Sequence, residues 1–214
     1  MRIVCISDTH NCNEQINVPD GDLLIHSGDA TINGSSAEIA AFDAWFSSLP
    51  HKHKIFVAGN HDWLFERDNA LARSMLDDSV VYLQDSSVEI DGLKIYGSPW
   101  QPRFFDWAFN LMRGPELAEK WRLIPNDIDI LITHGPPKGI LDEVPRNWGI
   151  ENTGCEELRK RMEQIAGSGR IKLHVFGHIH CGYGTHDEFG VKFVNASTCD
   201  EQYRPTQPPI VFDL

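Results

Sequence analysis

Five short apolar runs in this chain each end in residues that can bind a metal ion. The runs are rich in Val and Ile, which is typical of strands that are covered on both faces. They span residues 2–7, 22–27, 54–58, 128–133 and 171–176, and "DTHN", "GDA", "GNHD", "HGPP" and "GHIH" follow them. The carboxyl ends of strands line the ligand crevice in α/β folds. The pattern therefore predicts a sheet whose strand ends form one polar site.

The segments between these runs predict helices and further strands. Apolar residues recur at helical spacing, with Ser caps at the start of the first segment, over residues 35–49, 67–76, 114–123 and 152–167. Residues 86–98 predict a hairpin that turns at Asp91–Gly92. The tail supplies more strands, which we expect to be antiparallel. The sequence therefore predicts an α/β fold with at least eight strands in two packed mixed sheets, flanked by helices.

Length and charge restrict the partners of such a fold. No shift in composition divides the 214 residues, so we expect a single domain over 1–214. The formal charge is 19 − 31 = −12. An acidic surface repels polyanions, so we expect neither a polymeric nucleic acid nor an anionic membrane as partner. A small anion can still bind where a local cation reverses the field.

The five cysteines indicate a reducing compartment. Their number is odd, and none of them forms a Cys-x-x-Cys pair. The chain starts "MRIVCISD", with no long apolar leader, and no segment approaches a membrane-spanning length. We therefore expect reduced thiols and a cytoplasmic location.

The polar strand ends carry a chemically selective set of side chains. Any one of these clusters is weak evidence by itself, since "GNHD" is also a good turn sequence. Taken together they offer imidazole nitrogens, carboxylates and an amide oxygen, which suits divalent ions such as Mn, Fe, Zn, Co or Ni. The seven candidate ligands are Asp8, His10, Asp29, Asn60, His134, His178 and His180. Seven are too many for one ion and suit two ions that share a bridging carboxylate.

A charge count for such a centre favours a phosphate ester as the substrate. Two divalent ions bring +4, ionised Asp8 and Asp29 bring −2, and a bridging hydroxide brings −1. The sum of +1 attracts an anion even on this acidic chain. Two metals about 3.5–4 Å apart can activate a water molecule and hold phosphoryl oxygens.

The order of these blocks resembles that of the calcineurin-like metallophosphoesterase superfamily. Its pattern is Asp-x-His, Gly-Asp, Gly-Asn-His-Asp/Glu, His and Gly-His-x-His, and the chain shows "DTH" (8–10), "GD" (28–29), "GNHD" (59–62), "THGPP" (133–137) and "GHIH" (177–180). Longer stretches such as "LPHKHKIFVAGNHD", "IYGSPW" and "KLHVFGHIHCGYG" are similar to the metallophosphoesterase-domain-containing (MPPED) group. The resemblance implies a sandwich of two mixed sheets flanked by helices. It also implies phosphodiesterase activity on cyclic nucleotides and artificial diesters.

The same resemblance implies a role for each residue of the motifs. Asp8, His10 and His180 would hold one divalent transition-metal ion, Asn60, His134 and His178 a second, and Asp29 would bridge them. A metal-activated water would be the nucleophile. His61 would be the catalytic histidine that protonates the leaving oxygen, and Asp62 would orient its imidazole. Some relatives have Glu at position 62, and some have Gly at position 178, where the loss of the imidazole should weaken activity.

Two ligands of this set, His178 and His180, are separated in the sequence by a single residue. Alternate residues of an extended segment share a face, so we expect His178 and His180 to point the same way, one toward each ion. Gly177 would let the backbone approach without a Cβ in the way.

The substrate contacts are less constrained by the sequence. Residues 97–115 form the longest irregular stretch and contain Trp100, Phe104, Phe105, Trp107 and Phe109. Trp100 and its neighbours would stack a nucleobase or form a satellite hydrophobic cluster. Arg146 is a candidate phosphate contact, with an exposed solvated arginine as the alternative. The function alternatives are a phosphomonoesterase or protein phosphatase with the same site, and a non-catalytic scaffold with this fold.

Overall fold

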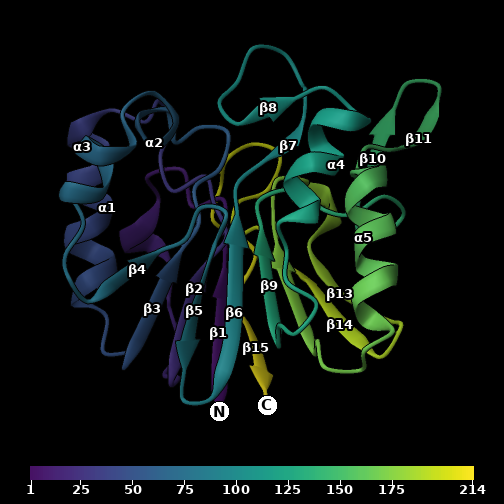
Figure 1. Ribbon diagram of the computed structural model, residues 1–214. Coiled ribbons are helices and arrows are strands. Elements are labelled where there is room, and N and C mark those ends of the chain that lie inside the picture. The colour runs from purple at the N-terminus through teal and green to yellow at the C-terminus, as the bar shows by residue number, and fades with distance from the viewer.

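The computed structural model describes residues 1–214 and packs two sheets face to face between outer helices (Figure 1). Strands β1 to β4 of the first sheet run parallel, and β15 pairs antiparallel with β1. Its order is β15 (Ile210–Asp213), β1 (Arg2–Ile6), β2 (Leu23–His26), β3 (His53–Phe56) and β4 (Val80–Tyr82). The second sheet is ordered β13 (Gly184–Glu188), β14 (Val191–Asn195), β12 (Leu173–Phe176), β9 (Ile130–Thr133), β6 (Leu93–Ser98) and β5 (Ser86–Ile90). The predicted α/β class with two mixed sheets is confirmed.

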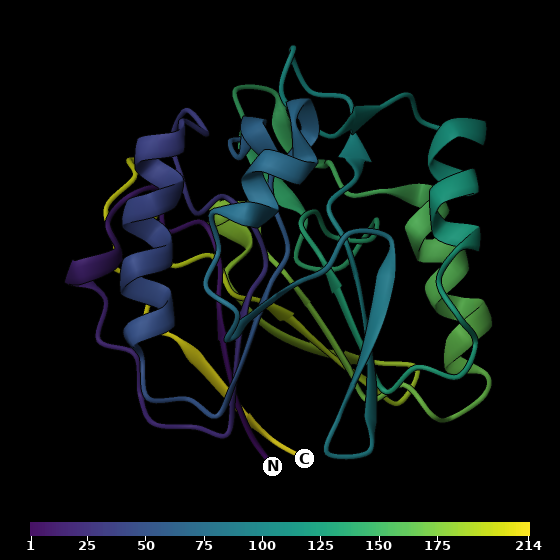
Figure 2. The same cartoon turned by 60° about the vertical axis from the view of Figure 1, so that its left-hand side comes forward.

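Helices cover the outer face of each sheet, as the two views in Figures 1 and 2 show. The first sheet carries α1 (Ser36–Ser48), α2 (Trp63–Arg67) and α3 (Asn69–Ser74), and the second carries α4 (Pro115–Arg122) and α5 (Glu156–Ala166). Helix α1 begins at a capping box, in which Ser35 and Glu38 satisfy each other's free backbone N–H groups. No helix is both long enough and apolar enough to cross a membrane.

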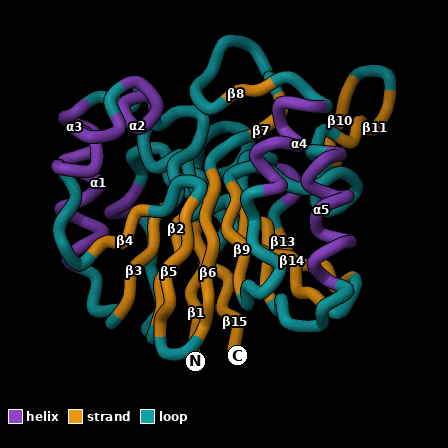
Figure 3. The backbone as a smooth tube through the Cα atoms, in the orientation of Figure 1, coloured by secondary structure: helices purple, strands orange, loops and turns teal.

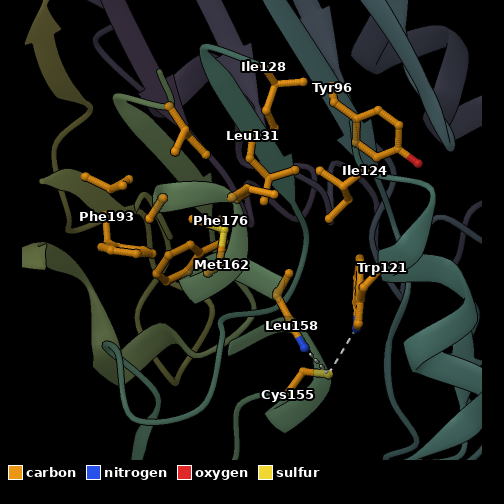
Figure 4. Close-up of a cluster of buried hydrophobic side chains, with 14 of the residues drawn as sticks. Tyr96, Trp121, Ile124, Ile128, Leu131, Cys155, Leu158, Met162, Phe176 and Phe193 are labelled. Atoms are coloured by element: carbon orange, nitrogen blue, oxygen red, sulfur yellow. Dashed lines mark hydrogen bonds between the residues drawn. The ribbon is translucent and has the colours of Figure 1, made fainter. Parts of the chain in front are cut away.

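The alternation of side chains along each strand builds three cores between the four layers. In β1, Ile3 and Cys5 face the second sheet, whereas Val4 and Ile6 face the helices α1 to α3. Both faces are therefore apolar, which explains the continuous hydrophobic runs of the sequence. Figure 4 shows the core between the second sheet and α4 and α5, where the Trp121 indole N–H donates to Cys155 Sγ at 3.2 Å.

The segments between the main strands differ from the prediction in two places. The expected helix over 67–76 is shorter in the structure, as α3 (Asn69–Ser74), because Asp68 leaves the helical conformation and caps α3 through Leu71 N; α2 (Trp63–Arg67) is a separate helix before it that was not expected. The expected helix over 152–167 begins only at Glu156, because β10 (Glu143–Arg146) and β11 (Gly149–Asn152) form a hairpin before it. The predicted turn at Asp91–Gly92 is confirmed, with φ values of 49° and 84°.

The parallel strands of both sheets end at the same edge of the sandwich, opposite the chain termini (Figure 3). At this edge Thr198 N donates to Ser7 O at 2.8 Å, which ties the end of β14 to the end of β1 and joins the two sheets. Two 3-10 turns, η1 (Asn13–Gln15) and η2 (His180–Gly182), and the short pair β7 (Gln101–Pro102) and β8 (Asn110–Leu111) also belong to the loops here.

Candidate metal centre

The seven candidate ligands converge at this edge from five different strand ends. Asp8 and His10 follow β1, Asp29 follows β2 and Asn60 follows β3, while His134 follows β9 and His178 and His180 follow β12. Ligand atoms of Asp8, His10 and His180 lie within 4.8 Å of one another, as do those of Asp29, His134 and His178. The structure therefore brings residues 170 positions apart in the sequence into one site.

The backbone is strained where it delivers these side chains. Asp8, His10, Asp29 and His178 have φ values of 52°, 42°, 55° and 68°, in the left-handed region that side chains other than glycine rarely adopt. Such conformations persist only where surrounding structure enforces them, and they gather at functional sites. At each of these left-handed residues the backbone turns sharply after the strand ends, so that the next side chains point back into the site.

Three of the histidines are oriented by backbone carbonyl groups. His10 Nδ1 lies 3.2 Å from Thr31 O, and His134 Nδ1 lies 3.0 Å from Ser27 O. His180 Nδ1 lies 2.9 Å from Asp200 O. Because a carbonyl oxygen can only accept, each Nδ1 must carry a hydrogen. Nε2 of each ring is then the nitrogen available to a metal, which is the usual arrangement around a metal-bound histidine.

The Nε2 atoms of these rings lie close to other hydrogen-bond acceptors. His10 Nε2 lies 3.3 Å from His180 Nε2, which in turn lies 3.3 Å from Asp8 Oδ1. When both rings are neutral and carry their hydrogen on Nδ1, they turn lone pairs toward each other and toward a carboxylate oxygen. Such a set is repulsive unless a proton or a metal cation lies among its members. The donor chemistry therefore fits a divalent ion with nitrogen and oxygen ligands.

A second group of acceptors continues from the first. His134 Nε2 lies 2.9 Å from Asn60 Oδ1 and 3.4 Å from Asp29 Oδ2. Asp29 Oδ2 also lies 3.9 Å from His10 Nε2. Asp29 thus lies between the two groups, in the place that a bridging carboxylate requires. The side chains present therefore suit a pair of metal ions as well as they suit a single ion.

The electrostatics of the site favour positive charge. Burial opposes protonation of His134 and His180, but the neighbouring carboxylates raise the pKa of each imidazole to about 9. Burial also opposes ionisation of Asp8 and Asp29, yet the surrounding histidines hold the pKa of both carboxyls below the ordinary value. The carboxylates are therefore ionised and attract protons or metal cations. Since ligands bind metal without those protons, metal binding would displace them.

His178 and His180 divide between the two groups, but not for the expected reason. Strand β12 ends at Phe176, His178 is left-handed and His180 opens the 3-10 turn η2, so the segment is not extended. The expectation of a shared strand face is therefore wrong. The reversal at His178 sends its ring against His134, at 4.9 Å between centroids, while His180 reaches Asp8.

Gly177 permits the close packing that the sequence predicted. A Cβ atom at this position would overlap Asp8 Oδ2 and the side chain of Ser7. Asp8 is held there by the backbone N–H of His178, at 3.1 and 3.0 Å to its two oxygens, and by the Ser197 hydroxyl at 2.9 Å. Only a residue without a side chain leaves room for this carboxylate.

His61 adjoins the candidate ligands, with a ring nitrogen within 4.8 Å of ligand atoms of His10 and Asp29, and is oriented by the main chain. Its Nδ1 lies 2.7 Å from Ile32 O, so Nδ1–H donates to that carbonyl and Nε2 remains free. Its backbone N–H donates to Asp29 Oδ1 at 2.8 Å, which ties the loop of His61 to the shared carboxylate. The imidazole also lines the cavity above the site.

Asp62 does not make the expected contact with His61. Its carboxylate is fully buried and accepts four hydrogen bonds from other groups. The donors are Gly59 N at 2.8 Å, Ala30 N at 3.3 Å, Thr31 N at 3.0 Å and Thr31 Oγ1 at 2.7 Å. The prediction that Asp62 orients the His61 imidazole is therefore wrong. Asp62 instead joins the loops after β2 and β3, which carry Asp29 and Asn60.

A cavity of about 740 Å³ opens above the centre. Its floor includes Asp29, Asn60, His61, His178 and His180, and its walls include Arg103, Phe104, Phe105, Trp107, Arg113, Val144, Arg146, Glu151, Ile179 and Tyr203. The Tyr203 ring packs edge-on against His10, with centroids 4.7 Å apart. The sequence gives no signal for Tyr203, since it lies in an irregular tail segment without a motif.

The two predicted substrate contacts have different outcomes. Trp100 does not line the cavity; its indole N–H donates to Asp85 at 2.8 Å and its ring packs against Phe109. Trp100 therefore belongs to the hydrophobic cluster that was the alternative interpretation, and its prediction as a substrate contact is wrong. Arg146 does line the cavity, but its Nε donates to Glu151 at 2.8 Å across the hairpin, so part of its charge is already paired.

Comparisons with known proteins agree with this geometry. The family model described as Calcineurin-like phosphoesterase matches residues 1–182. Metallophosphoesterase domain-containing protein 1 of Homo sapiens is 44% identical over an alignment of 235 residues, which covers 100% of this chain and 71% of the human protein. The mouse protein of the same name gives the same values. A UPF0046 protein of Caenorhabditis elegans is 40% identical over 226 residues, covering 99% of this chain and 74% of the worm protein.

Proposed function

Because this chain belongs to the calcineurin-like phosphoesterase family, we propose that it is a dinuclear metal-dependent phosphodiesterase acting on small nucleotide-like diesters such as cyclic nucleotides. The observation that carries the proposal is the convergence of seven nitrogen and oxygen side chains beside a cavity, which four of them line together with the imidazole of His61. Family membership by itself supports the coarser activity, phosphoester hydrolysis.

The ligands divide between two ions in the proposed enzyme. Asp8, His10 and His180 would hold one, Asn60, His134 and His178 the other, and Asp29 both. When bound, such ions supply Lewis acidity and lower the pKa of a water molecule so that it can attack phosphorus. The mixture of imidazole, carboxylate and amide ligands suits Mn, Fe or Zn.

His61 would handle the proton of the leaving group. Its Nδ1–H is fixed on Ile32 O, so Nε2 is the nitrogen that can carry a proton into the cavity. A proton donated from Nε2 to the departing oxygen neutralises the charge that develops there, which typically contributes 10²–10⁴-fold in rate. Asp62 would act only by holding the loop of His61 in place.

The cavity supports a diester more than a monoester. Aromatic and apolar side chains from different loops line the cavity, with Phe104 and Phe105 on one loop and Val144 and Ile179 on others. A diester has a substituent on each side of phosphorus, and such apolar walls would accommodate both. The five free cysteines support the cytoplasm as the place of action.

A substrate panel tests the proposal. The protein is loaded in turn with Mn, Fe, Zn and Co, bound metal is counted by mass spectrometry, and turnover is compared for bis(p-nitrophenyl) phosphate, p-nitrophenyl phosphate and 2′,3′-cyclic nucleotides. We expect about two ions per chain and faster turnover of the diesters. Preference for the monoester would favour a phosphomonoesterase. Tight metal binding without turnover of any ester would favour a scaffold and would refute the proposal.

A further inference from the structure

A tryptophan of the long irregular loop lies directly on the imidazole of His61. The ring centroids of Trp107 and His61 are 4.2 Å apart, with 35° between the planes. Trp107 also packs near Trp63, with centroids 6.5 Å apart, and the Arg67 guanidinium lies 4.2 Å above the Trp63 ring. Trp63 and Arg67 belong to α2, which follows His61 in the sequence, so this helix packs beside the tryptophan that covers the imidazole.

The loop is fastened to the same segment that carries His61. Ala108 N donates to Asn60 O at 3.2 Å, and Phe109 N donates to Glu66 Oε1 at 2.9 Å. The Phe109 side chain is fully buried. These anchors lie immediately after Trp107, so its backbone cannot move away from His61 without breaking them. Trp107 is therefore built into the wall of the cavity.

The imidazole needs such a contact, because its hydrogen bonding fixes it at only one atom. Nδ1–H donates to Ile32 O, and the ring also meets His10 edge-on with centroids 4.8 Å apart, but no second hydrogen bond fixes its rotation about the Nδ1–H bond. The carboxylate of Asp62, which was expected to restrain it, binds backbone groups of Gly59, Ala30 and Thr31 instead. A flat indole at 4.2 Å removes the swinging motion that a single hydrogen bond permits.

We propose that Trp107 is a positioning residue for His61, holding the imidazole so that Nε2 is aimed at the leaving-group oxygen of the substrate. The inference rests on the proposed function, in which His61 donates that proton. Displacement of a catalytic group by about 1 Å can lower a rate by 10²-fold. The loss should therefore depend on how much the leaving group needs a proton.

Two diesters separate this role from a general one. The alkoxide released from a 2′,3′-cyclic nucleotide needs the proton, whereas p-nitrophenolate leaves without it. We expect Trp107→Leu to lower kcat by about 10- to 100-fold on the cyclic nucleotide and by less than about 3-fold on bis(p-nitrophenyl) phosphate. Trp107→Phe should recover most of the loss. Trp148→Leu, at the exposed hairpin turn outside the cavity, is the matched control and should change neither rate.

Two further measurements are independent of these rates. The double variant His61→Ala/Trp107→Leu should be no slower than His61→Ala, and bound metal per chain should stay unchanged in Trp107→Leu. In the NMR spectrum, the His61 ring signal, assigned by its absence in His61→Ala, should be shifted by the indole ring current and should move in Trp107→Leu.

The outcomes are distinguishable. Equal losses on both diesters, additive losses in the double variant, or a His61 signal that does not move would overturn the positioning role. If the signal moves but the unaltered enzyme hydrolyses neither diester, the proposed function fails while the contact that restrains His61 stands.

Discussion

The structure predicts that Asp62→Asn acts on stability rather than on proton transfer. Asp62 is fully buried, and its two oxygens accept from two donors each. Oδ1 accepts from Thr31 N and Thr31 Oγ1, and Oδ2 accepts from Gly59 N and Ala30 N. An asparagine replaces one of these oxygens by an NH₂ group, which can only donate.

The size of the expected loss of stability follows from the hydrogen-bond donors that an asparagine side chain would leave without an acceptor. With its oxygen toward Gly59 and Ala30, the amide can donate to the Thr31 hydroxyl, which is able to accept. Only Thr31 N then loses its partner, and an unpaired buried donor costs about 1–3 kcal/mol. The remaining bonds lose the charge of the acceptor, which weakens them. Burial and the neighbouring Asp29 oppose this by raising the pKa of Asp62 to about 6, so the variant also removes an unfavourable buried charge. We expect the free energy of unfolding to fall by about 1–3 kcal/mol, and Tm by about 2–12 °C for a chain of this size.

Urea unfolding of the metal-free protein measures this effect without interference from bound ions. Asp127→Asn is the matched control, because it makes the same chemical change in an exposed ion pair with Lys94. Its effect should stay within about 1 kcal/mol. His61→Ala should also lower stability, because it removes a buried ring that packs against Trp107, but it leaves only one hydrogen-bond acceptor, Ile32 O, without its partner.

The opposite pattern would refute the reasoning. If Asp62→Asn kept the stability of the unaltered protein and lost turnover as severely as His61→Ala, Asp62 would act through the imidazole after all. The contacts with Gly59, Ala30 and Thr31 would then be of little consequence in solution.

The other predictions concern the ligand loops and the capping box. Gly177→Ala should displace Asp8, lower bound metal and destabilise the fold by about 1–3 kcal/mol, as mass spectrometry and urea unfolding would show; Gly167→Ala, where nothing is crowded, is the control. His178→Gly should lower bound metal from about two ions to one without loss of metal-free Tm, because φ is 68° and glycine relieves the strain; unchanged metal content would contradict the ligand role. For Glu38, burial raises the pKa, but hydrogen bonds from Ser35, Asn11 and the backbone outweigh it and lower the pKa to about 2. This stabilisation is complete above the ordinary pKa of 4.5 and is lost as the pH falls toward 2. The Glu38→Gln variant should therefore be less stable than the unaltered protein by about 1 kcal/mol at pH 7, a value already reduced because Glu38 is partly exposed to solvent. In urea unfolding at pH 3 this difference should be smaller.

The sequence predicts the central strands and their layers well because these strands are covered on both sides. Alternate residues of β1 enter different cores, so every position is apolar and the run is easy to recognise. The helix boundaries were harder to predict, because they depend on single side-chain contacts. Asp68 ends one helix and caps the next, and no periodicity of apolar residues indicates that break.

The sequence predicts the residue types of the metal centre, but it does not predict which groups contact the residues around that centre. The motifs place metal-binding residue types at the ends of successive strands. Because these strands end at one edge of the sandwich, the motifs indicate a single shared site. The partner of a buried carboxylate depends on the path of loops that are distant in sequence. Asp62 adjoins His61 in the chain, yet it faces the loop of Ala30 and Thr31. Trp100 and Trp107 belong to one aromatic stretch, and only the fold decides which of them reaches the cavity.

In the proposed enzyme, the charge of the chain would make bound metal a requirement for substrate binding as well as for chemistry. The protein carries −12, Asp29 lines the floor of the cavity, and the fully buried Asp8 belongs to the same candidate centre; both carboxyls have a lowered pKa and add negative charge there. Arg146 is paired with Glu151, and Arg113 donates to the carbonyl groups of Thr153 and Gly154. Neither arginine forms an ion pair with Asp8 or Asp29. Two divalent ions in the proposed sites would leave +2 against the two carboxylates, so attraction of the anion and activation of water would depend on the same ligands. A loss of one ligand should therefore weaken substrate binding and turnover together.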